Sequence, residues 1–504
     1  MTPPLATAVL GAAAPATATS TASGPHDVLL DVIAVGNVLV LGYFLAINTG
    51  YLTLVLIAAG DFVRHLRRTP FAGYDDASAS PFTLPVSLIV PAYNEEAGIV
   101  DAVQALLLLR HPSFEVVVVD DGSTDATLDR LREAFDLVEV PHVVSTEVPV
   151  RGAVESVHLP RGGPVSLIVA RKRNGGKADA LNVGINLARY PLLCMVDADS
   201  ILDSQALLAI SKPFADDPLR VVGAGGVIGI ANGCTVVAGR VVRVRMPHRL
   251  LAKIQTVEYM RAFLLGRTGW SRIGGLLVIA GAFGMFRRDA VVAVGGLDPD
   301  CLGEDAELVV RLHHYLRGTG HDYRIVFVGE PISWSEAPET LRVLGRQRRR
   351  WHRGLTEVLL KHRGMIGHPR YGRVGLVALP FYVLFELCAP VVELAGLVLV
   401  PLGLLIGAVD LGFLWRFLLA SYGYAMVISL LSILAEEYAF HRYSRWRDIS
   451  SAVLGAAAEN LGYRQFTAWW RVRGIWDAVH GAPKVWGVMT RRGFAAEPTE
   501  GDRQ

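Results

Sequence analysis

Two aspartates in the middle of the chain have the spacing of a metal-ligand pair. Asp197 and Asp199 follow the apolar run Leu192–Val196. In an extended strand, residues at i and i+2 project to the same side, where two carboxylates repel each other unless a cation or hydrogen-bond donors compensate them. Their hard oxygen atoms suit Mg²⁺ or Mn²⁺, with a diphosphate completing the coordination shell. The pair therefore predicts a divalent metal site.

Two further acidic loops have a local explanation beside a functional one. Pro91–Glu96 and Asp120–Asp125 each follow an apolar run, and Asn, Asp, Ser and Gly are favoured in turns and helix caps. A turn or cap explains either loop in isolation. Three acidic loops after successive apolar runs are hard to explain in that way alone, so we expect them to share a site.

The loop Gly175-Gly176-Lys177 is a candidate phosphate-binding element. Glycines followed by a lysine at a helix start can present backbone N–H groups and a cation to a phosphate. The loop is not a Walker A motif, because Ala178 stands where Ser or Thr should follow the lysine. The glycine run Gly223–Gly229 lacks the spacing of a dinucleotide fingerprint, and we interpret it as a close-packed strand.

Short apolar runs alternate with helical patterns, and this alternation predicts the framework that positions the loops. The expected strands are Val86–Val90, Glu115–Asp120, Ser166–Ala170 and Leu192–Val196, and the expected helices are Glu95–Arg110, Thr124–Phe135 and Lys177–Arg189. Strand and helix in alternation predict a parallel sheet with right-handed crossovers. Such sheets bind ligands beyond the carboxyl ends of their strands, which is where the acidic loops fall.

The composition is typical of a membrane protein. Of the 504 residues, 52% are hydrophobic and 19% are charged, which is too apolar for an ordinary soluble chain. The net charge of +2 argues against nucleic acid as a partner. Four dispersed cysteines without a C-x-x-C pair predict neither a zinc site nor a disulfide framework.

Apolar and charged stretches divide the chain into six expected segments. They are a disordered tail (1–27), a transmembrane helix (28–61), a cytoplasmic α/β domain (82–367), an interfacial helix (368–389), two transmembrane helices (390–437) and a cytoplasmic amphipathic tail (438–504). Basic runs at Arg64–Arg68 and His441–Arg447 mark cytoplasmic ends by the positive-inside rule. We therefore expect a multi-pass protein of the cell membrane, with three spans, the N-terminus outside and the C-terminus inside.

An ordered series of motifs resembles a known enzyme family. The series is Asp120-Asp121-Gly122-Ser123, Gly176-Lys177-Ala178, Asp197-Ala198-Asp199, Gly303-Glu304-Asp305 and Gln347-Arg348-Arg349-Arg350-Trp351. Over about Pro85–Arg353 the order is similar to that of membrane-embedded family-two glycosyltransferases, which include cellulose, chitin, hyaluronan and poly-N-acetylglucosamine synthases. The resemblance implies that segment 82–367 is a GT-A domain, an α/β fold with a mostly parallel sheet that binds a nucleotide sugar.

The resemblance also assigns roles to the residues that match the motifs. Tyr93, Glu95 and Asp121 would hold the uridine, Lys177 would hold the diphosphate, and Asp197 with Asp199 would hold the metal-bound donor. Asp305 would be the general base that takes the proton from the acceptor hydroxyl. Gln347, Arg350 and Trp351 would cover the donor diphosphate and the acceptor sugar. The residue types suit the chemistry, because an acceptor hydroxyl is a poor nucleophile that needs a general base. A departing diphosphate gathers charge that Mg²⁺ or Mn²⁺ and basic side chains stabilise.

Local explanations stay open for two of these motifs. Glu304-Asp305 is also typical of a charge pair at a helix N-terminus, and the basic run Arg346–Arg353 is also typical of a positive-inside interfacial helix. Two features depart from the family pattern. Gly303 precedes the acidic pair where Thr is common, and Leu137–Pro164 inserts a long loop before the third expected strand. Such loops are often functional, but the sequence assigns this one no role.

The implied function is an inverting glycosyltransferase that uses a nucleotide sugar, usually a UDP-sugar in this family, to extend a β-linked polysaccharide at the cytoplasmic membrane. One alternative is a non-processive transferase that adds a single sugar to a lipid or another acceptor. A second is a catalytically silent membrane scaffold, against which the complete set of carboxylates argues. The expected partners are the donor, a growing glycan or lipid acceptor and the bilayer. A homo-oligomer or an accessory secretion partner is also open, because three spans are few for a polysaccharide conduit.

Overall fold

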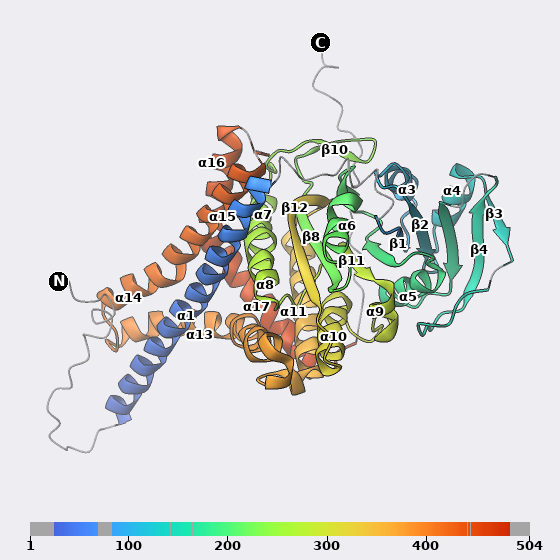
Figure 1. Ribbon diagram of the computed structural model, residues 1–504. Coiled ribbons are helices and arrows are strands. Elements are labelled where there is room, and N and C mark those ends of the chain that lie inside the picture. Colours follow the sequence, from blue (N-terminus) through green and yellow to red (C-terminus); the bar gives the residue numbers. More distant parts are fainter. Residues whose placement is uncertain are drawn as a thin grey trace, which may run out of the picture.

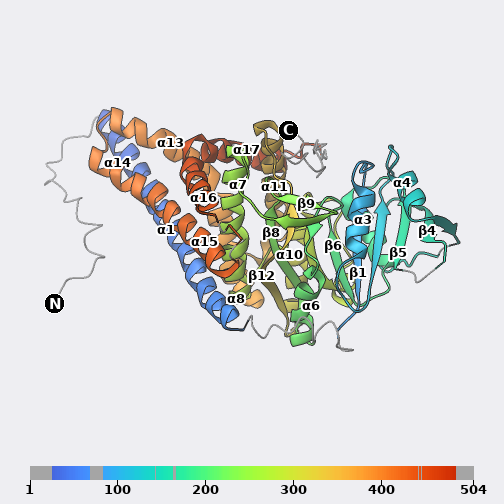
Figure 2. The ribbon, with the colours of Figure 1, turned by 90° about the horizontal axis from the view of Figure 1, so that it is seen from above.

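The computed structural model describes residues 25–68, 83–141, 143–162, 166–440, 442–443 and 445–483. Of the two expected tails, residues 1–24 and 484–504 lie outside this range. Long helices lie on one side of the molecule and a sheet flanked by helices lies on the other, in both views (Figure 1, Figure 2). The fold therefore separates a helical part from an α/β part.

One sheet of ten strands forms the centre of the α/β part, in the order β3-β4-β5-β2-β1-β6-β11-β8-β12-β7. Strands β5, β2, β1 and β6 are parallel neighbours, and of the ten only β4, β7 and β11 run against the common direction. Their bounds are β1 Val86–Ala92, β2 Phe114–Asp120, β3 Leu137–Val140, β4 Val154–Pro160, β5 Leu167–Lys172, β6 Leu192–Val196, β7 Ile201–Leu202, β8 Val221–Ile230, β11 Phe283–Arg287 and β12 Arg324–Ser335. The four expected strands are β1, β2, β5 and β6, so the expected mostly parallel α/β sheet is confirmed.

Helices cover both faces of this sheet because its central strands are apolar on both sides. Successive side chains of a strand point to opposite faces. Leu88 and Val90 of β1 enter one apolar core with helices α3 (Ile99–Leu107), α4 (Thr127–Ala134) and α6 (Ala206–Asp216). Ile89 enters a second core with α5 (Lys177–Leu187). The expected crossover helices are present as α3, α4 and α5, somewhat shorter than the sequence patterns.

The long insertion at Leu137–Pro164 extends the sheet at one edge. Its two ends form strands β3 and β4, which pair antiparallel with each other, and β4 pairs with β5. The connecting chain returns to α5, where the backbone N–H of Val148 donates to Asn186 Oδ1 at 2.9 Å and Asn186 Nδ2 donates to the Val148 carbonyl at 2.8 Å. The insertion therefore covers a sheet edge and holds α5 from outside.

The second half of the α/β part depends on close packing at glycines. A Cβ atom on Gly229 of β8 would lie 2.5 Å from the Trp334 ring of β12, which confirms that the glycine run is a close-packed strand. The remaining elements are the hairpin β9 Thr235–Val237 and β10 Arg240–Arg243, and the helices α7 Leu250–Tyr259, η2 Met260–Arg267 (a π-helix), α8 Thr268–Ile273, α9 Arg288–Ala293, α10 Glu304–Gly318 and α11 Leu341–Lys361.

Three helices of the described chain are long and apolar enough to cross a membrane: Pro25–Gly60, Val374–Leu405 and Leu411–Tyr438. The first belongs to α1 (Pro25–Arg68), the second comprises η5 Val374–Ala378, α12 Leu379–Phe381, η6 Tyr382–Leu387 and α13 Ala389–Leu405, and the third comprises α14 Leu411–Leu418, η7 Leu419–Gly423 and α15 Tyr424–Phe440. The second candidate span begins inside the segment expected as an interfacial helix (368–389), and α13 begins at the expected division. The chain is a membrane protein.

Two buried asparagines tie α1 to the other two candidate spans. Asn37 Nδ2 donates to the Leu399 carbonyl of α13 at 3.1 Å, and Asn48 Nδ2 donates to the Ala420 carbonyl of η7 at 2.9 Å. Such interhelical hydrogen bonds are a common link between helices in a bilayer. Farther along, Leu54 of α1 packs against Gly269 of α8. Helix α1 therefore connects the helical part with the α/β part.

The C-terminal helices return to the α/β part. They are α16 Trp446–Ala458, η8 Glu459–Tyr463 and α17 Arg464–Val479, and α17 packs along both α11 and α13. Helix α17 exposes Phe466, Trp469, Trp476 and Val479 at intervals of three to seven residues. An exposed aromatic stripe beside arginines is typical of a helix that lies on a membrane surface, so the amphipathic tail (438–504) stays a prediction.

A substitution at Gly184 of α5 tests the packing between this helix and β1. A Cβ atom there would overlap the Ile89 side chain, and overpacking a core costs about 1–3 kcal/mol. We expect Gly184→Ala to lower the unfolding temperature of the detergent-purified protein, measured by differential scanning fluorimetry. Gly364→Ala is the matched control, because nothing lies within 4 Å of a Cβ atom at that position. Equal unfolding temperatures for the two variants would contradict this packing.

Candidate active site

The loops that follow β1 and β2 are joined by hydrogen bonds. The backbone N–H of Asn94 donates to Ser123 Oγ at 3.0 Å, and that of Glu95 donates to Thr127 Oγ1 at 2.9 Å. Ser123 N–H in turn donates to Asp120 Oδ1 at 3.0 Å. The turn and cap explanation thus holds for part of each acidic loop. The Tyr93 side chain stays 48% exposed at this edge, where it can reach a ligand.

A buried lysine at the end of β5 organises the glycine-rich loop. Lys172 is fully buried, and its Nζ lies 2.6 Å from Asp121 Oδ1 and 2.8 Å from Asp179 Oδ2. The N–H groups of Gly175 and Gly176 donate to the two oxygens of Asp121 at 2.9 and 2.8 Å. Asp121 therefore holds the loop in place. A carboxylate accepts about four hydrogen bonds, so one position remains beside these three donors.

Asp179 connects the same lysine to the insertion. Its two oxygens accept hydrogen bonds from the N–H groups of Arg151, at 2.7 Å, and Gly152, at 3.0 Å. Burial opposes ionisation of Asp179, yet Lys172 and these two donors hold its pKa below the usual value. Burial raises the pKa of Asp121, and Lys172 works against that rise. One ammonium group thus joins the loop after β2, the first turn of α5 and the insertion.

Lys177, at the first position of α5, lies between two acidic elements. Its Nζ pairs with Asp197 Oδ1 at the end of β6 and lies 4.0 Å from Glu304 Oε1 at the start of α10. Burial disfavours the charged form of Lys177, but Asp197 and Glu304 raise its pKa above the usual value. The lysine stays a cation, as binding to a diphosphate requires.

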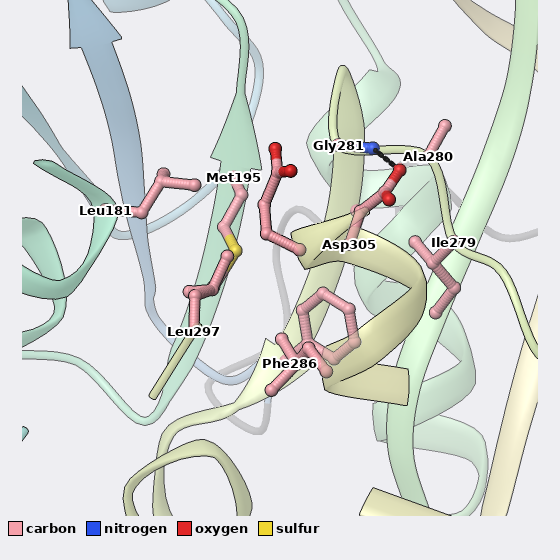
Figure 3. A pocket seen from close by; sticks show the side chains of 11 residues that line it. Leu181, Met195, Ile279, Ala280, Gly281, Phe286, Leu297 and Asp305 are labelled. Carbon is pink, nitrogen blue, oxygen red and sulfur yellow. Dashed lines mark hydrogen bonds between the residues drawn. The ribbon is translucent and has the colours of Figure 1, made fainter. Parts of the chain in front are cut away.

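Asp305 lies in the first turn of α10 and lines a small cavity beside strands β6 and β11 (Figure 3). Its Oδ2 accepts a hydrogen bond from Gly281 N–H at 3.0 Å, and its Oδ1 accepts one from Ala306 N–H at 2.7 Å. A Cβ atom on Gly281 would lie 3.2 Å from Lys177 Nζ and 3.5 Å from Asp305 Cβ. The backbone at Gly281 therefore lies between the ammonium group of Lys177 and the carboxylate of Asp305, the candidate base.

Helix α11 contributes the basic motif, and its arginines have different contacts. Arg348 Nη2 lies 2.6 Å from Glu258 Oε2, Arg349 Nη2 lies 2.6 Å from Asp477 Oδ1, and Arg353 Nη1 donates to the Pro483 carbonyl at 3.1 Å. These three arginines attach α11 to its neighbours. Thus the interfacial-helix explanation covers part of the run.

Arg350 and its neighbours face a different environment. The Arg350 charge lowers the pKa of Glu304, which puts it near the acidic pair. Gln347 is 8% exposed, and its Oε1 has no hydrogen-bond partner among the described residues. Trp351 is 42% exposed. An orphaned buried acceptor and an exposed indole on one helical face suit a ligand with hydroxyl groups.

Gly303 is explained by the packing of α10 against α11. A Cβ atom on Gly303 would lie 3.1 Å from the carbonyl carbon of Gly354, and a Cβ atom on Gly354 would lie 2.8 Å from Gly303 N. The two backbones therefore approach where a larger side chain does not fit. This contact accounts for glycine in the position where the family commonly has Thr.

The residues present fit a divalent cation held jointly with a substrate. Among the described residues, no three His, Cys, Asp or Glu side chains form a metal cluster. Asp197 is 28% exposed at the end of β6, two residues before Asp199. Mg²⁺ is usually bound by one or two carboxylates together with substrate phosphates and water. The donor set matches that mode rather than a closed protein site.

The structure joins some of the expected site residues and leaves others apart. Direct contacts link Lys177 with Asp197 and Glu304, and Gly281 connects them to Asp305. Tyr93, Glu95 and Asp121 belong to the adjoining loops, and Gln347, Arg350 and Trp351 lie on α11. Sequence reasoning assigned no role to Lys172 or Asp179. A lysine ending a β-branched strand and an aspartate in an otherwise apolar helix were the available signals.

The buried Glu304 predicts a pH-dependent stability. Burial raises its pKa from 4.5 to about 7, an effect that Lys177 opposes and Asp305 increases. Because Glu304 binds its proton more tightly in the folded protein than in the unfolded chain, its protonation contributes to the free energy of unfolding. This contribution is complete below about pH 4.5 and is lost as the pH rises through about 7. We expect Glu304→Gln to gain stability relative to wild type between pH 5 and 8, by on the order of 3 kcal/mol.

Thermal unfolding across this pH range measures the difference between Glu304→Gln and wild type. Glu133→Gln is the control, because Glu133 lies on the exposed face of α4. Parallel pH profiles for wild type and Glu304→Gln would show that Glu304 keeps an ordinary pKa.

Comparisons of the sequence find relatives over the α/β part. A family profile described as "Glycosyltransferase like family 2" matches residues 84–354. The chain is similar to a poly-beta-1,6-N-acetyl-D-glucosamine synthase of Staphylococcus aureus, with 31% identity over 281 residues, 55% of this chain and 56% of the relative. It is 29% identical over 276 residues to the synthase of the same name from Staphylococcus epidermidis. The chain spans about half the length of the curated relatives it matches.

Comparison of the fold finds a solved mannosyltransferase from Pyrobaculum calidifontis, in complex with GDP-Man and Mn²⁺. The structural alignment covers 85% of this chain and all of the mannosyltransferase chain, with a TM-score of 0.47 and 16% sequence identity. The family profile covers more than half of the chain, including the sheet, the acidic loops and most of α11. The chain therefore belongs to the glycosyltransferase-like family 2, and the family's domain is the α/β part of this membrane protein.

Proposed function

We propose that this enzyme transfers the sugar of a UDP-sugar with inversion at its anomeric carbon. The transfer extends a β-linked polysaccharide at the inner face of the membrane. The observation that carries the proposal is the cluster of Lys177, Asp197, Glu304 and Asp305 around Gly281. It combines a cation for a diphosphate, a carboxylate for a metal and a carboxylate for a proton. Those three functions are the requirements of glycosyl transfer from a nucleotide sugar.

The donor would bind across the ends of β1, β2 and β6. Tyr93, Glu95 and Asp121 hold the uridine, with Asp121 using the acceptor position that the loop leaves open. Lys177 holds the diphosphate, and Asp197 with Asp199 hold a Mg²⁺ or Mn²⁺ ion. When bound, that ion would neutralise the charge that gathers on the departing diphosphate.

The acceptor would approach Asp305 from the side of α11. Asp305 takes the proton of the attacking hydroxyl, while its hydrogen bonds from Gly281 and Ala306 hold the carboxylate in one orientation. The start of a helix favours the ionised form of an acidic residue. Gln347 and Arg350 would contact the donor diphosphate, and Trp351 offers an apolar face to the acceptor sugar.

The relatives suggest the sugar and its linkage. Both are poly-beta-1,6-N-acetyl-D-glucosamine synthases, so we propose UDP-N-acetylglucosamine as the donor and a β-1,6-linked chain as the product. The active site would face the cytoplasm, where nucleotide sugars are made, with the N-terminus outside and three spans. A second copy of the chain or an accessory membrane protein would complete a secretion path.

A panel of UDP-sugars tests the proposed reaction. We expect the purified wild-type enzyme in nanodiscs to release UDP from UDP-N-acetylglucosamine and to form a polymer that a β-1,6-specific glycosidase degrades. Asp305→Asn should retain UDP affinity and lose transfer by about two orders of magnitude or more, because the base is removed. Addition of one sugar without further growth would identify a non-processive enzyme. Near-normal transfer by Asp305→Asn would refute the base assignment.

Removal of the metal tests the roles of Asp197 and Asp199. We expect excess chelator to abolish transfer and weaken UDP binding, and Mg²⁺ or Mn²⁺ to restore both. Asp199→Asn should show the same losses without chelator and with an unchanged unfolding temperature. Asp203→Asn is the matched control, because Asp203 is an exposed aspartate directly after β7. Full activity in chelator would exclude a metal role for the pair.

Replacement of Lys172 tests how the donor loop is held. Removing one partner of a buried ion pair is strongly destabilising, by about 3–5 kcal/mol. We expect Lys172→Met to lower the unfolding temperature and weaken UDP affinity, because Asp121 and Asp179 lose their shared cation. The double variant Lys172→Met with Asp179→Asn should recover part of the stability. Lys212→Met removes an exposed ion pair and should change neither quantity.

A further inference from the structure

Arg267 is a cation without a counter-ion at the junction between the sheet and the candidate spans. It ends the π-helix η2 (Met260–Arg267), which packs against α1 and α15 on one side and β8 and β12 on the other. Within the described part of the chain, its guanidinium makes no ion pair or hydrogen bond, and its Nη1 is buried without a partner. Its guanidinium carbon lies 3.8 Å from the centroid of the Phe263 ring.

Comparable arginines nearby are paired. Arg261 of the same π-helix lies 2.7 Å from Glu459 and 2.8 Å from Ser429 Oγ. Arg348 lies 2.6 Å from Glu258. A buried charge left without a partner destabilises a fold, so a role in stabilising the fold does not explain why Arg267 is present. Burial lowers the pKa of Arg267 below the usual value. The nearby Tyr382, Asp305 and Tyr259 act against this decrease.

The surroundings of Arg267 are aromatic, and the charge of Asp305 acts on its guanidinium. The rings of Tyr259 and Phe263 stack at 5.1 Å, and Tyr382 of η6 lies 5.9 Å from the Trp270 ring. Beside Arg267, Thr268 Oγ1 is also buried without a partner in the described chain. Aromatic faces with unused hydrogen-bonding groups match a neutral sugar better than an ion.

The π-helix gives this interpretation a second, independent support. Single π-helical turns inside α-helices are rare and occur frequently at functional sites. Here η2 interrupts what is otherwise one helical run from α7 to α8, and the irregular turn carries both Phe263 and Arg267.

We propose that Arg267 is an acceptor-binding residue, whose guanidinium donates hydrogen bonds to hydroxyl or acetamido oxygens of the acceptor saccharide on the membrane side of Asp305. The proposal rests on the proposed function and deepens it. The acceptor would lie between α11, with Trp351, and η2, with Arg267. The donor would lie on the opposite side of Asp305, toward Lys177.

Separate measurements of the donor and the acceptor test this assignment. We would compare Arg267→Gln and Arg267→Lys with Arg272→Gln, an exposed arginine on the adjacent helix α8. The readouts are UDP affinity, UDP release without acceptor, and transfer to a β-1,6-linked N-acetylglucosamine tetrasaccharide. For Arg267→Gln we expect UDP affinity and acceptor-free release within about twofold of wild type. We expect the KM for the tetrasaccharide to rise about tenfold or more, the effect of losing a hydrogen bond to a charged group.

Each outcome separates acceptor binding from other roles. Arg267→Lys keeps the charge and should show a smaller rise in KM, whereas Arg272→Gln should behave as wild type. An unchanged acceptor KM in Arg267→Gln would overturn the proposal, and so would parallel losses of UDP affinity and acceptor-free release in both Arg267 variants. A wild-type enzyme that releases UDP from no UDP-sugar would instead refute the proposed function itself, and this proposal with it.

Discussion

The buried ammonium group of Lys172 is the interaction on which the donor side of the site depends. Taking one lysine out of water is costly, and here two carboxylates and a backbone carbonyl surround it. Those carboxylates, Asp121 and Asp179, in turn receive the N–H groups of Gly175, Gly176, Arg151 and Gly152. Three chain segments distant in sequence thus share one charge. The position of Lys177, the first residue of α5, follows from that arrangement.

The acceptor side is built on different principles. Helix α11 is held by ion pairs from Arg348 and Arg349 to α7 and α17, and α17 exposes an aromatic stripe. Gly345 and Gly474 allow the two helices to approach closely, at Trp470 and at the Arg349 carbonyl. The helix with the exposed aromatic stripe therefore packs directly on the helix that carries Gln347 and Trp351.

The sequence predicted the elements whose pattern is local. Strands β1, β2, β5 and β6 are short runs of β-branched residues, and the strand order placed Asp197 and Lys177 at one edge. It did not predict the role of Lys172, because a lysine among arginines gives no sign that two distant carboxylates will enclose it. Nor did it predict the strands β11 and β12, whose partners are far along the chain. The hairpin β3-β4 was visible only as an insertion, since β4 acquires its partner β5 through tertiary contact.

The charges of the site explain why its two sides differ. On the donor side, the charge of Lys177 is compensated by Asp197 and Glu304. When a diphosphate binds with its metal ion, Lys177 can pair with the diphosphate and the carboxylates with the metal, so no charge is left unpaired. On the acceptor side, Arg267 has an aromatic contact and no ion-pair partner within the described chain. A neutral sugar offers hydrogen-bond acceptors without a counter-charge, so it satisfies the guanidinium without adding a charge beside Asp305. An acidic partner for Arg267 would instead occupy the hydrogen-bond donors of the guanidinium, which is a physical reason for leaving this arginine unpaired.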